Sequence, residues 1–152
     1  MFRGLSSGQM DSKGRITIPA NYRTMMVEEA SGSLVVTIDP EERCLLLYPF
    51  PAWQVIEEKL ESLPSFQPAA RRIQRLLMGH ATELELDRQG RILLPKLLCD
   101  YAEIDRTAIL VGQGKKIEIW SEPVWEDARI TWLAESMGEN HNVPMELAML
   151  SL

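Results

Sequence analysis

Two short segments of this sequence place an aspartate four positions before an arginine, with a glycine directly before the arginine. They are Asp11–Arg15, which contains Gly14, and Asp87–Arg91, which contains Gly90. Aspartate at the first position of a type I turn can accept backbone N–H bonds, and glycine suits a following position with positive φ. An arginine fixed just past such a turn presents its planar fork with little loss of entropy, which suits bidentate contact with a phosphate or a guanine edge. The pattern predicts two anion-binding turns.

The same spacing also has a purely structural interpretation, in which Asp11 and Arg15 form a local ion pair that closes the turn. The two interpretations are compatible, because the carboxylate could fix the turn while the guanidinium reaches outward. A strand after the turn would place Ile16 and Ile18 on one face and Arg15 with Thr17 on the other. We therefore expect the apolar face to pack and the arginine face to remain accessible.

The two copies of the motif differ at residues that bear on nucleic-acid contact. Lys13, at the tip of the first turn, would add attraction to phosphate, and Gln89 occupies the matching position of the second turn. Thr17 is matched by Leu93 in the same way. These differences predict that the first copy contributes more to binding than the second.

The match between the two turns belongs to an internal repeat that organises the whole chain. Asp11–Pro19 recurs as Asp87–Pro95, with the Asp, Gly, Arg, Ile and Pro residues in register. Two further blocks match in the same order, Leu34–Thr37 with Ala108–Val111 and Leu45–Trp53 with Ile117–Trp125. We therefore divide the chain into a first repeat (1–53), linker helices (54–79), a second repeat (80–125) and a C-terminal helical segment (126–152).

Apolar periodicity and turn residues predict the same elements in each repeat: a hairpin around the turn, a short helix, two strands and a longer helix. The second hairpin is expected from the alternation of Leu84, Leu86, Ile92 and Leu94. Pro19 and Pro95 are expected at the first helical position. The later strands are expected at 34–38, 44–48, 108–111 and 116–120, and the longer helices at 52–63, 68–79 and 124–137. Half-repeats this short would bury little surface alone, so we expect one β-rich α+β unit, pseudo-symmetric and β-barrel-like, with flanking helices.

Cationic residues are concentrated in two segments, although the chain of 152 residues has a formal net charge of −6. A DNA-binding domain usually has a basic total, yet residues 1–23 hold four cations against a single acid. The candidate DNA-contacting residues are Arg3, Lys13, Arg15, Thr17, Arg23 and Arg91, with Asp11, Gly14, Asp87 and Gly90 supporting the turns. The second basic segment, 65–80, contains Arg71, Arg72 and Arg75. For these three the alternatives are a solvated face, a contact with an acidic segment of another subunit, and a contact with phosphate.

Other classes of function find little support in the sequence. Its apolar stretches are far shorter than the roughly eighteen residues of a membrane span, and the N-terminus lacks the apolar run of a signal peptide. We therefore expect a cytoplasmic protein with no membrane partner. Cys44 and Cys99 lack C-x-x-C spacing and are expected to be buried, and His80 and His141 lack ligand spacing, so neither a metal nor a cofactor is expected. The Gly112–Gly114 segment lacks the third glycine of a dinucleotide fingerprint, and no hydrolase, metalloprotease or P-loop motif occurs. An enzyme with a small-molecule substrate is not expected.

The two aspartate–arginine segments resemble the AbrB-like swapped-hairpin DNA-binding superfamily, and their tandem arrangement resembles the MraZ family. Three further segments are also similar to MraZ sequences, Met1–Gly4, Cys44–Pro49 and Arg71–His80. The resemblance covers essentially the whole chain. It implies a nucleoid-associated transcription regulator that represses the division and cell-wall gene cluster containing its own gene, by binding repeated promoter boxes. It also implies a ring-like homo-oligomer, commonly an octamer, on double-stranded DNA, with Arg15 and Arg91 at the positions of the DNA-contacting arginine.

A protein-interaction module is the alternative, because AbrB-like folds also occur in antitoxins whose disordered tails block a toxin. The tail of this chain, residues 138–152, is short and contains several apolar side chains. Such a tail suits docking or self-association better than wrapping around a toxin.

Overall fold

Strands and helices follow one another in the order that the repeat predicts. The computed structural model describes residues 1–136 and 144–151. The strands are β1 (Phe2–Gln9), β2 (Arg15–Thr17), β3 (Ser33–Ile38), β4 (Leu45–Pro49), β5 (Thr82–Glu85), β6 (Arg91–Leu93), β7 (Thr107–Gly114) and β8 (Ile117–Ser121). The helices are α1 (Ala20–Ala30), α2 (Phe50–Glu61), α3 (Pro68–Leu77), α4 (Lys96–Ala102), α5 (Glu122–Ser136) and α6 (Met145–Ala148). The predicted β-rich α+β class is confirmed.

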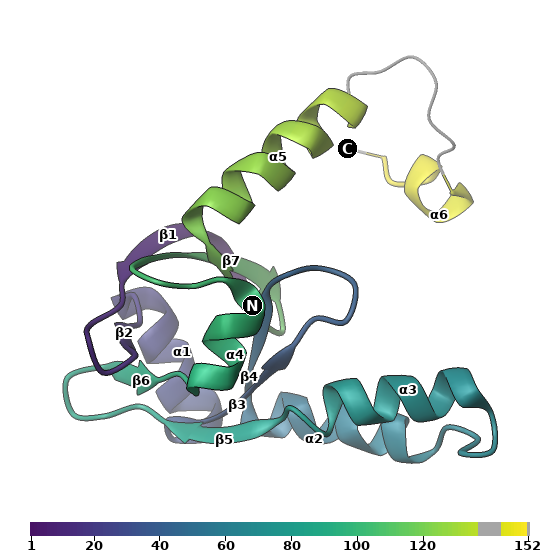
Figure 1. Ribbon diagram of the computed structural model, residues 1–152, viewed down its shortest axis with the longest axis horizontal. Coiled ribbons are helices and arrows are strands. Elements are labelled where there is room, and N and C mark those ends of the chain that lie inside the picture. Colours follow the sequence, from purple (N-terminus) through teal and green to yellow (C-terminus); the bar gives the residue numbers. More distant parts are fainter. Residues whose placement is uncertain (137–143, 152) are drawn as a thin grey trace.

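Strands of both repeats build one antiparallel sheet. Its order is β1-β7-β8-β4-β3-β5, and β2 and β6 form a separate two-stranded ribbon (Figure 1). Each strand has a counterpart in the other repeat: β1 and β5, β2 and β6, β3 and β7, and β4 and β8. When every strand is replaced by its counterpart, the sheet has the same strand order in reverse. The molecule therefore has pseudo-two-fold symmetry, with the axis between β4 and β8 and through the ribbon.

The arms of the predicted hairpins do not pair with each other as strands. β1 pairs along its length with β7, and β5 pairs with β3, while β2 and β6 pair together. Next to the first turn a single isolated bridge joins the two arms, between Met10 and Ile16. The hairpin prediction was wrong because apolar alternation indicates that a strand has a buried face, but does not identify its partner. The two repeats interlock instead.

The six-stranded sheet is open, so the predicted β-barrel is wrong for this sheet. Within residues 1–136 and 144–151, β1 and β5 are its two edge strands. They are pseudo-symmetric counterparts at opposite ends of the order, and each leads into a turn that carries the chain to the ribbon. Their free edges therefore do not meet.

One hydrophobic core fills the space between the ribbon and the sheet. The ribbon contributes Ile16 and Ile92, the sheet contributes side chains such as Val36 and Leu110, and α1 adds Tyr22, all of them buried. Burial of an aliphatic side chain of this size contributes about 1.5 to 3 kcal/mol. Because both repeats supply the core, neither would retain it alone.

The helices that follow the ribbon begin directly after a proline. Pro19 and Pro95 are the N-caps of α1 and α4, one position earlier than predicted, because their ψ values of 145° and 138° are still extended. The α2–α3 pair extends from the body on one side, and α5 extends from a different side (Figure 1). The predicted end of α5 at Met137 lies outside the described residues. No helix in the part of the chain that the structure describes is both long and apolar enough to cross a membrane.

Candidate nucleic-acid interface

The β2–β6 ribbon has one buried face and one accessible face. Ile16 lies opposite Ile92 at its centre, and both side chains are buried against the sheet. Because neighbouring residues of a strand point to opposite faces, the flanking residues face outward. These are Arg15 opposite Leu93, and Thr17 opposite Arg91. Two arginines related by the pseudo-symmetry therefore share the outer face.

A dense set of hydrogen bonds fixes the first turn. The Gly14 backbone N–H donates to the Asp11 carbonyl at 3.1 Å, and the Asp11 N–H donates to the Arg15 carbonyl at 2.9 Å. One carboxylate oxygen of Asp11 accepts the backbone N–H groups of Lys13 and Arg15, both at 2.9 Å, and the other accepts Arg15 Nε at 2.7 Å. These bonds, the one from the Arg15 backbone above all, lower the pKa of Asp11 from 3.8 to about 2. Asp11 therefore stays ionised and holds both the turn and the arginine.

The second turn repeats this geometry. The Asp87 carboxylate accepts the backbone N–H groups of Gln89 at 2.9 Å and Arg91 at 2.8 Å, and Arg91 Nε donates to it at 2.9 Å. The bond from the Arg91 backbone is the main cause that lowers the pKa of Asp87 below its usual 3.8.

Both ion pairs engage only the inner nitrogen of the guanidinium. Among the described residues, the side-chain hydrogen bonds of Arg15 and Arg91 are made by Nε, and the terminal Nη atoms make none. The local ion pair and an outward-reaching fork are therefore present together in each turn. The aspartate orients the arginine, and the end of the guanidinium is left for an anion.

Each turn is also tied to the opposite repeat. The Ile18 N–H donates to the Gly90 carbonyl, and the Leu94 N–H donates to the Gly14 carbonyl, both at 2.9 Å. Gly14 and Gly90 have φ values of 88° and 75°, in the left-handed region that side chains disfavour. At Gly14 an added Cβ would also lie 3.2 Å from the Leu94 carbonyl oxygen. Glycine is thus required both by the turn and by the cross-repeat bond.

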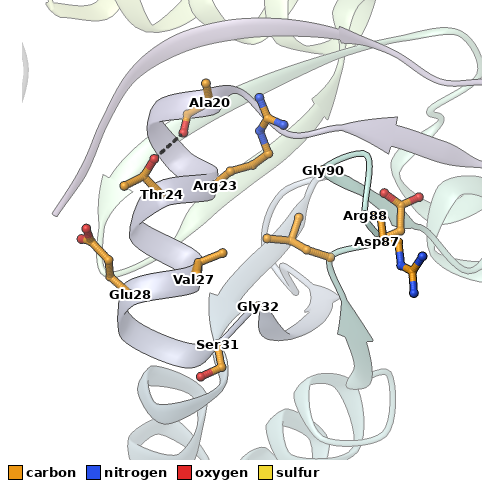
Figure 2. Close-up of a pocket in the computed structure, with 11 residues that line it drawn as sticks. Ala20, Arg23, Thr24, Val27, Glu28, Ser31, Gly32, Asp87, Arg88 and Gly90 are labelled. Atoms are coloured by element: carbon orange, nitrogen blue, oxygen red, sulfur yellow. Dashed lines mark hydrogen bonds between the residues drawn. The ribbon is translucent and has the colours of Figure 1, made fainter.

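Different side chains lie behind the two turns. The second turn faces α1, where an added Cβ at Gly90 would clash with the Arg23 side chain (Figure 2). Arg23 Nε is buried and has no hydrogen-bond partner among the described residues. The first turn faces α4, where Cys99 occupies the matching position and its thiol lies 3.9 Å from the Met10 sulfur. Arg23 therefore belongs to the second turn in space, although it lies in the first repeat in sequence.

A pocket of about 590 Å³ lies between α1 and the second turn (Figure 2). Its lining includes Arg23 and Glu28 from α1, and Asp87 and Arg88 from the turn. Charges of both signs meet there, so the pocket has no clear preference for an anion or a cation. The candidate anion-binding groups are those on the outer face of the ribbon.

Not all of the predicted contact residues lie near the ribbon. Lys13 is exposed at the tip of the first turn, and Thr17 is exposed on the outer face. Arg3 is also exposed, but it lies near the start of β1, whereas the turn follows the end of that strand. A single short DNA contact at the ribbon would therefore not include Arg3.

Arg88 is a cation that comparison of the two sequence copies missed. It is exposed in the second turn, where Ser12 occupies the matching place in the first turn. Each turn therefore carries one cation in addition to the ribbon arginine, Lys13 in the first turn and Arg88 in the second. A comparison of Lys13 with Gln89 alone does not reveal this. Arg88 could have been found in the sequence by comparing the total charge of one turn with that of the other.

A separate cluster brings together Asp39, Cys44 and Glu118, whose possible ligand atoms lie within 4.8 Å of one another. Burial disfavours the ionised form and is the main cause that raises the pKa of the Cys44 thiol and of Glu118. Metal ligation requires the deprotonated thiol and carboxylate. The Trp120 indole N–H donates to Glu118 at 3.1 Å. Cys44 and Cys99 are both buried, as the sequence predicts.

Comparison with known proteins places the chain in one family. The family model described as "MraZ protein, putative antitoxin-like" matches residues 1–76 and again residues 77–140. The transcriptional regulator MraZ of Coxiella burnetii is 59% identical over 152 residues, with 100% of both chains covered. Those of Legionella pneumophila and Halorhodospira halophila are 49% and 45% identical over 152 residues, again with 100% of both chains covered. With both repeats matched and full-length relatives this similar, the chain belongs to the MraZ family.

Proposed function

We propose that this chain is a sequence-specific transcription regulator that binds double-stranded DNA through the outer face of the β2–β6 ribbon. One observation carries the proposal: the ribbon holds Arg15 and Arg91 on one accessible face, each oriented by an aspartate through Nε. A two-stranded ribbon fits the major groove, where arginine makes bidentate contact with guanine. The relatives named above are transcriptional regulators, a class of protein distinct from enzymes.

In this proposal the ribbon arginines contact bases, and the exposed cations of the turns, Lys13 and Arg88, contact phosphates. Thr17 adds a hydrogen-bonding group to the face. Leu93, at the matching position, offers only apolar contact, such as with a thymine methyl group. The two halves of the ribbon therefore prefer different base steps.

Arg23 and Arg3 have less direct parts in this proposal. Arg23 supports the second turn from behind and adds positive potential to it. Arg3 reaches DNA only where the duplex continues past the ribbon along β1, or where a neighbouring subunit binds beside it.

The interlocked turns and strands are consistent with an AbrB-like swapped-hairpin fold, and we infer that several copies act together. A chain of net charge −6 with only a few cations at its ribbon would bind DNA weakly alone. A ring-like homo-oligomer presents several ribbons at once, and repeated boxes in one promoter match such an array. The natural target is the promoter of the division and cell-wall gene cluster that holds its own gene, where binding represses transcription in the nucleoid.

Footprinting the purified full chain on DNA upstream of its own gene tests the proposal. We expect several short protected boxes that repeat one sequence, and salt dependence that steepens as boxes are added. Protection that is uniform along the DNA would exclude sequence-specific recognition.

A protein-interaction role is the second candidate, because the matching family model carries the description antitoxin-like. Residues 138–143 of the tail, which include His141, lie outside the described residues. Stoichiometric co-purification of an unrelated protein, together with the absence of a footprint, would favour this role over DNA binding.

A further inference from the structure

We infer that the outward face of α5 docks against the outward face of α3 in a second copy of this chain, in a head-to-tail contact. This inference rests on the multimeric assembly in the proposed function, and names the surfaces that would build it. The side chains that form both faces are exposed in the described part of the chain.

One side of α5 is fastened to the body by tryptophans. Trp125 and Trp132 stack edge-on against Trp120, with ring centroids 5.6 Å apart in both pairs. Helical spacing places a mixed acidic and apolar stripe on the opposite side. This outward face of α5 consists of Glu122, Glu126, Asp127, Ile130 and Leu133, all exposed. The exposed Arg129 lies at its edge, beside Glu126 and Leu133, and leaves the face acidic in total. Ile130 is 61% exposed and Leu133 is 45% exposed, so the apolar end of the stripe has no covering partner among residues 1–136 and 144–151.

The outward face of α3 has the opposite charge. The inner side of this helix packs on α2 through Ile73 and Leu77, and Gln74 Nε2 donates to the Leu60 carbonyl at 2.7 Å. The outer side consists of Arg71, Arg72 and Arg75, all exposed. None of the three forms a salt bridge within the described residues. Like charges at i and i+4 destabilise a helix slightly, so an acidic partner would stabilise α3.

The two faces match in charge and in spacing. Three carboxylates of α5 face three guanidinium groups of α3 when the helices run antiparallel. With Glu126 beside Arg72, the rise of a helix places Leu133 about 10 Å further along, toward the start of α3. Phe66, which is 81% exposed, precedes α3 on that side. The apolar end of the α5 stripe therefore meets an exposed aromatic side chain.

A second copy is the occupant because α5 and the α2–α3 pair extend from different sides of the body (Figure 1). One chain cannot bring its own two faces together. A contact between unlike faces repeats from copy to copy, and it closes into a ring when the rotation per copy allows. DNA phosphate is the competing partner for the three arginines, and the test below separates the two.

The experiment measures particle mass by light scattering without DNA, using two charge-reversed full-length variants. The α3 variant carries Arg71→Glu, Arg72→Glu and Arg75→Glu, and the α5 variant carries Glu122→Arg, Glu126→Arg and Asp127→Arg. Each alone should fall from a multimer to the 17.3 kDa chain. Mixed together, they should assemble again into a multimer in which the two variants alternate, because both faces of one variant now complement both faces of the other. A chain carrying all six changes should assemble again.

A control variant carries charge reversals on a helix outside the proposed contact. Glu28→Arg with Glu29→Arg reverses two exposed acids of α1 and should leave the mass unchanged. Circular dichroism confirms folding, and Arg71→Ala with Arg75→Ala replaces the α3 variant if that one unfolds. An α3 variant that keeps its mass and loses affinity for DNA would assign the arginines to phosphate and overturn the inference. Two dissociated variants that do not form a complex with each other would overturn it as well. Neither result would affect the ribbon proposal, which is tested by Arg15.

Discussion

The first and second turns have nearly the same backbone, yet they differ in the side chains around it. In both, an aspartate accepts two backbone N–H bonds and the Nε of an arginine, and a glycine with positive φ accepts a bond from the other repeat. On the exposed side, the first turn and its strand carry Lys13 and Thr17, and the second turn and its strand carry Arg88 and Leu93. Behind, Cys99 supports the first turn, and Arg23 supports the second.

This difference separates two requirements that a single motif has to satisfy. The aspartate and the glycine determine the conformation of the turn and orient the arginine, so all three residues recur in both turns. The cations at the tip determine only the local electrostatic potential. A cation at either of two turn positions, that of Lys13 or that of Arg88, supplies this potential. We therefore expect the two halves of the ribbon to be equivalent in folding and distinct in recognition.

Substitutions at the centre of the ribbon should have the largest effect on stability, and they test whether the two halves of the ribbon are equivalent in folding. Ile16→Ala and Ile92→Ala each leave a cavity in the shared core, and each should lower the free energy of unfolding by about 2 to 5 kcal/mol. Because the two side chains are opposite each other and both are buried, the two losses should be similar. Urea unfolding of the two variants measures this. A large loss for one and a negligible loss for the other would contradict the pseudo-symmetry of the core.

Substitution of the turn glycines should have a smaller effect on stability, and it tests which side chain packs behind each turn. Alanine at either position should cost about 1 to 2 kcal/mol for its left-handed backbone. Gly90→Ala also displaces Arg23, so part of its cost should disappear in an Arg23→Ala background. Gly14→Ala meets the Leu94 carbonyl oxygen instead, and its cost should persist in that background. A double-mutant cycle measures the coupling, and equal coupling of both glycines to Arg23 would refute the assignment of Arg23 to the second turn.

The turn aspartates give the smallest effect, visible at low pH. Asp11 has a pKa of about 2 in the folded chain, below the value of about 4 expected in the unfolded chain. Its stabilising contribution is therefore complete above pH 4 and is lost as pH falls from about 4 toward 2. Asp87 should lose its contribution in the same direction, because its pKa is lowered by the same kind of bonds. Carboxyl chemical shifts followed by NMR measure both pKa values, and unshifted values would rule out the hydrogen bonds described for the turns.

The elements could largely be predicted from the sequence, but their pairing could not. Periodicity located the strands and helices, and the repeat indicated pseudo-symmetry, because both depend on patterns along the chain. Periodicity did not predict the exchange of β1 and β5 between repeats, since alternating residues such as Leu84 and Leu86 fit any antiparallel neighbour. Only the resemblance to the swapped-hairpin superfamily implied an exchange. The open sheet was missed for the same reason, because closure depends on which strands remain at the edges.

The candidate site was predictable where it depends on local bonding. The spacing of Asp11, Gly14 and Arg15 indicated both the turn and the ion pair. The place of Arg23 could not be inferred, because a helix of the first repeat packs behind a turn of the second. Arg88 was detectable from charge alone, but alignment of the copies residue by residue drew attention to Lys13.

The most direct test of the account is the DNA affinity of Arg15→Ala and Arg91→Ala proteins on the footprinted boxes, measured at one fixed salt concentration. Loss of a bidentate base contact costs about 1 to 3 kcal/mol per subunit, and several subunits bound together multiply the loss. Both variants should remain folded and keep the particle mass of the unmodified chain, because both side chains lie on the accessible face. We predict that Arg15→Ala abolishes specific binding, that Arg91→Ala weakens it less, and that the double variant binds only as non-specific DNA does. Wild-type affinity in a folded Arg15→Ala, Arg91→Ala protein would contradict the assignment of the ribbon as the DNA-binding face.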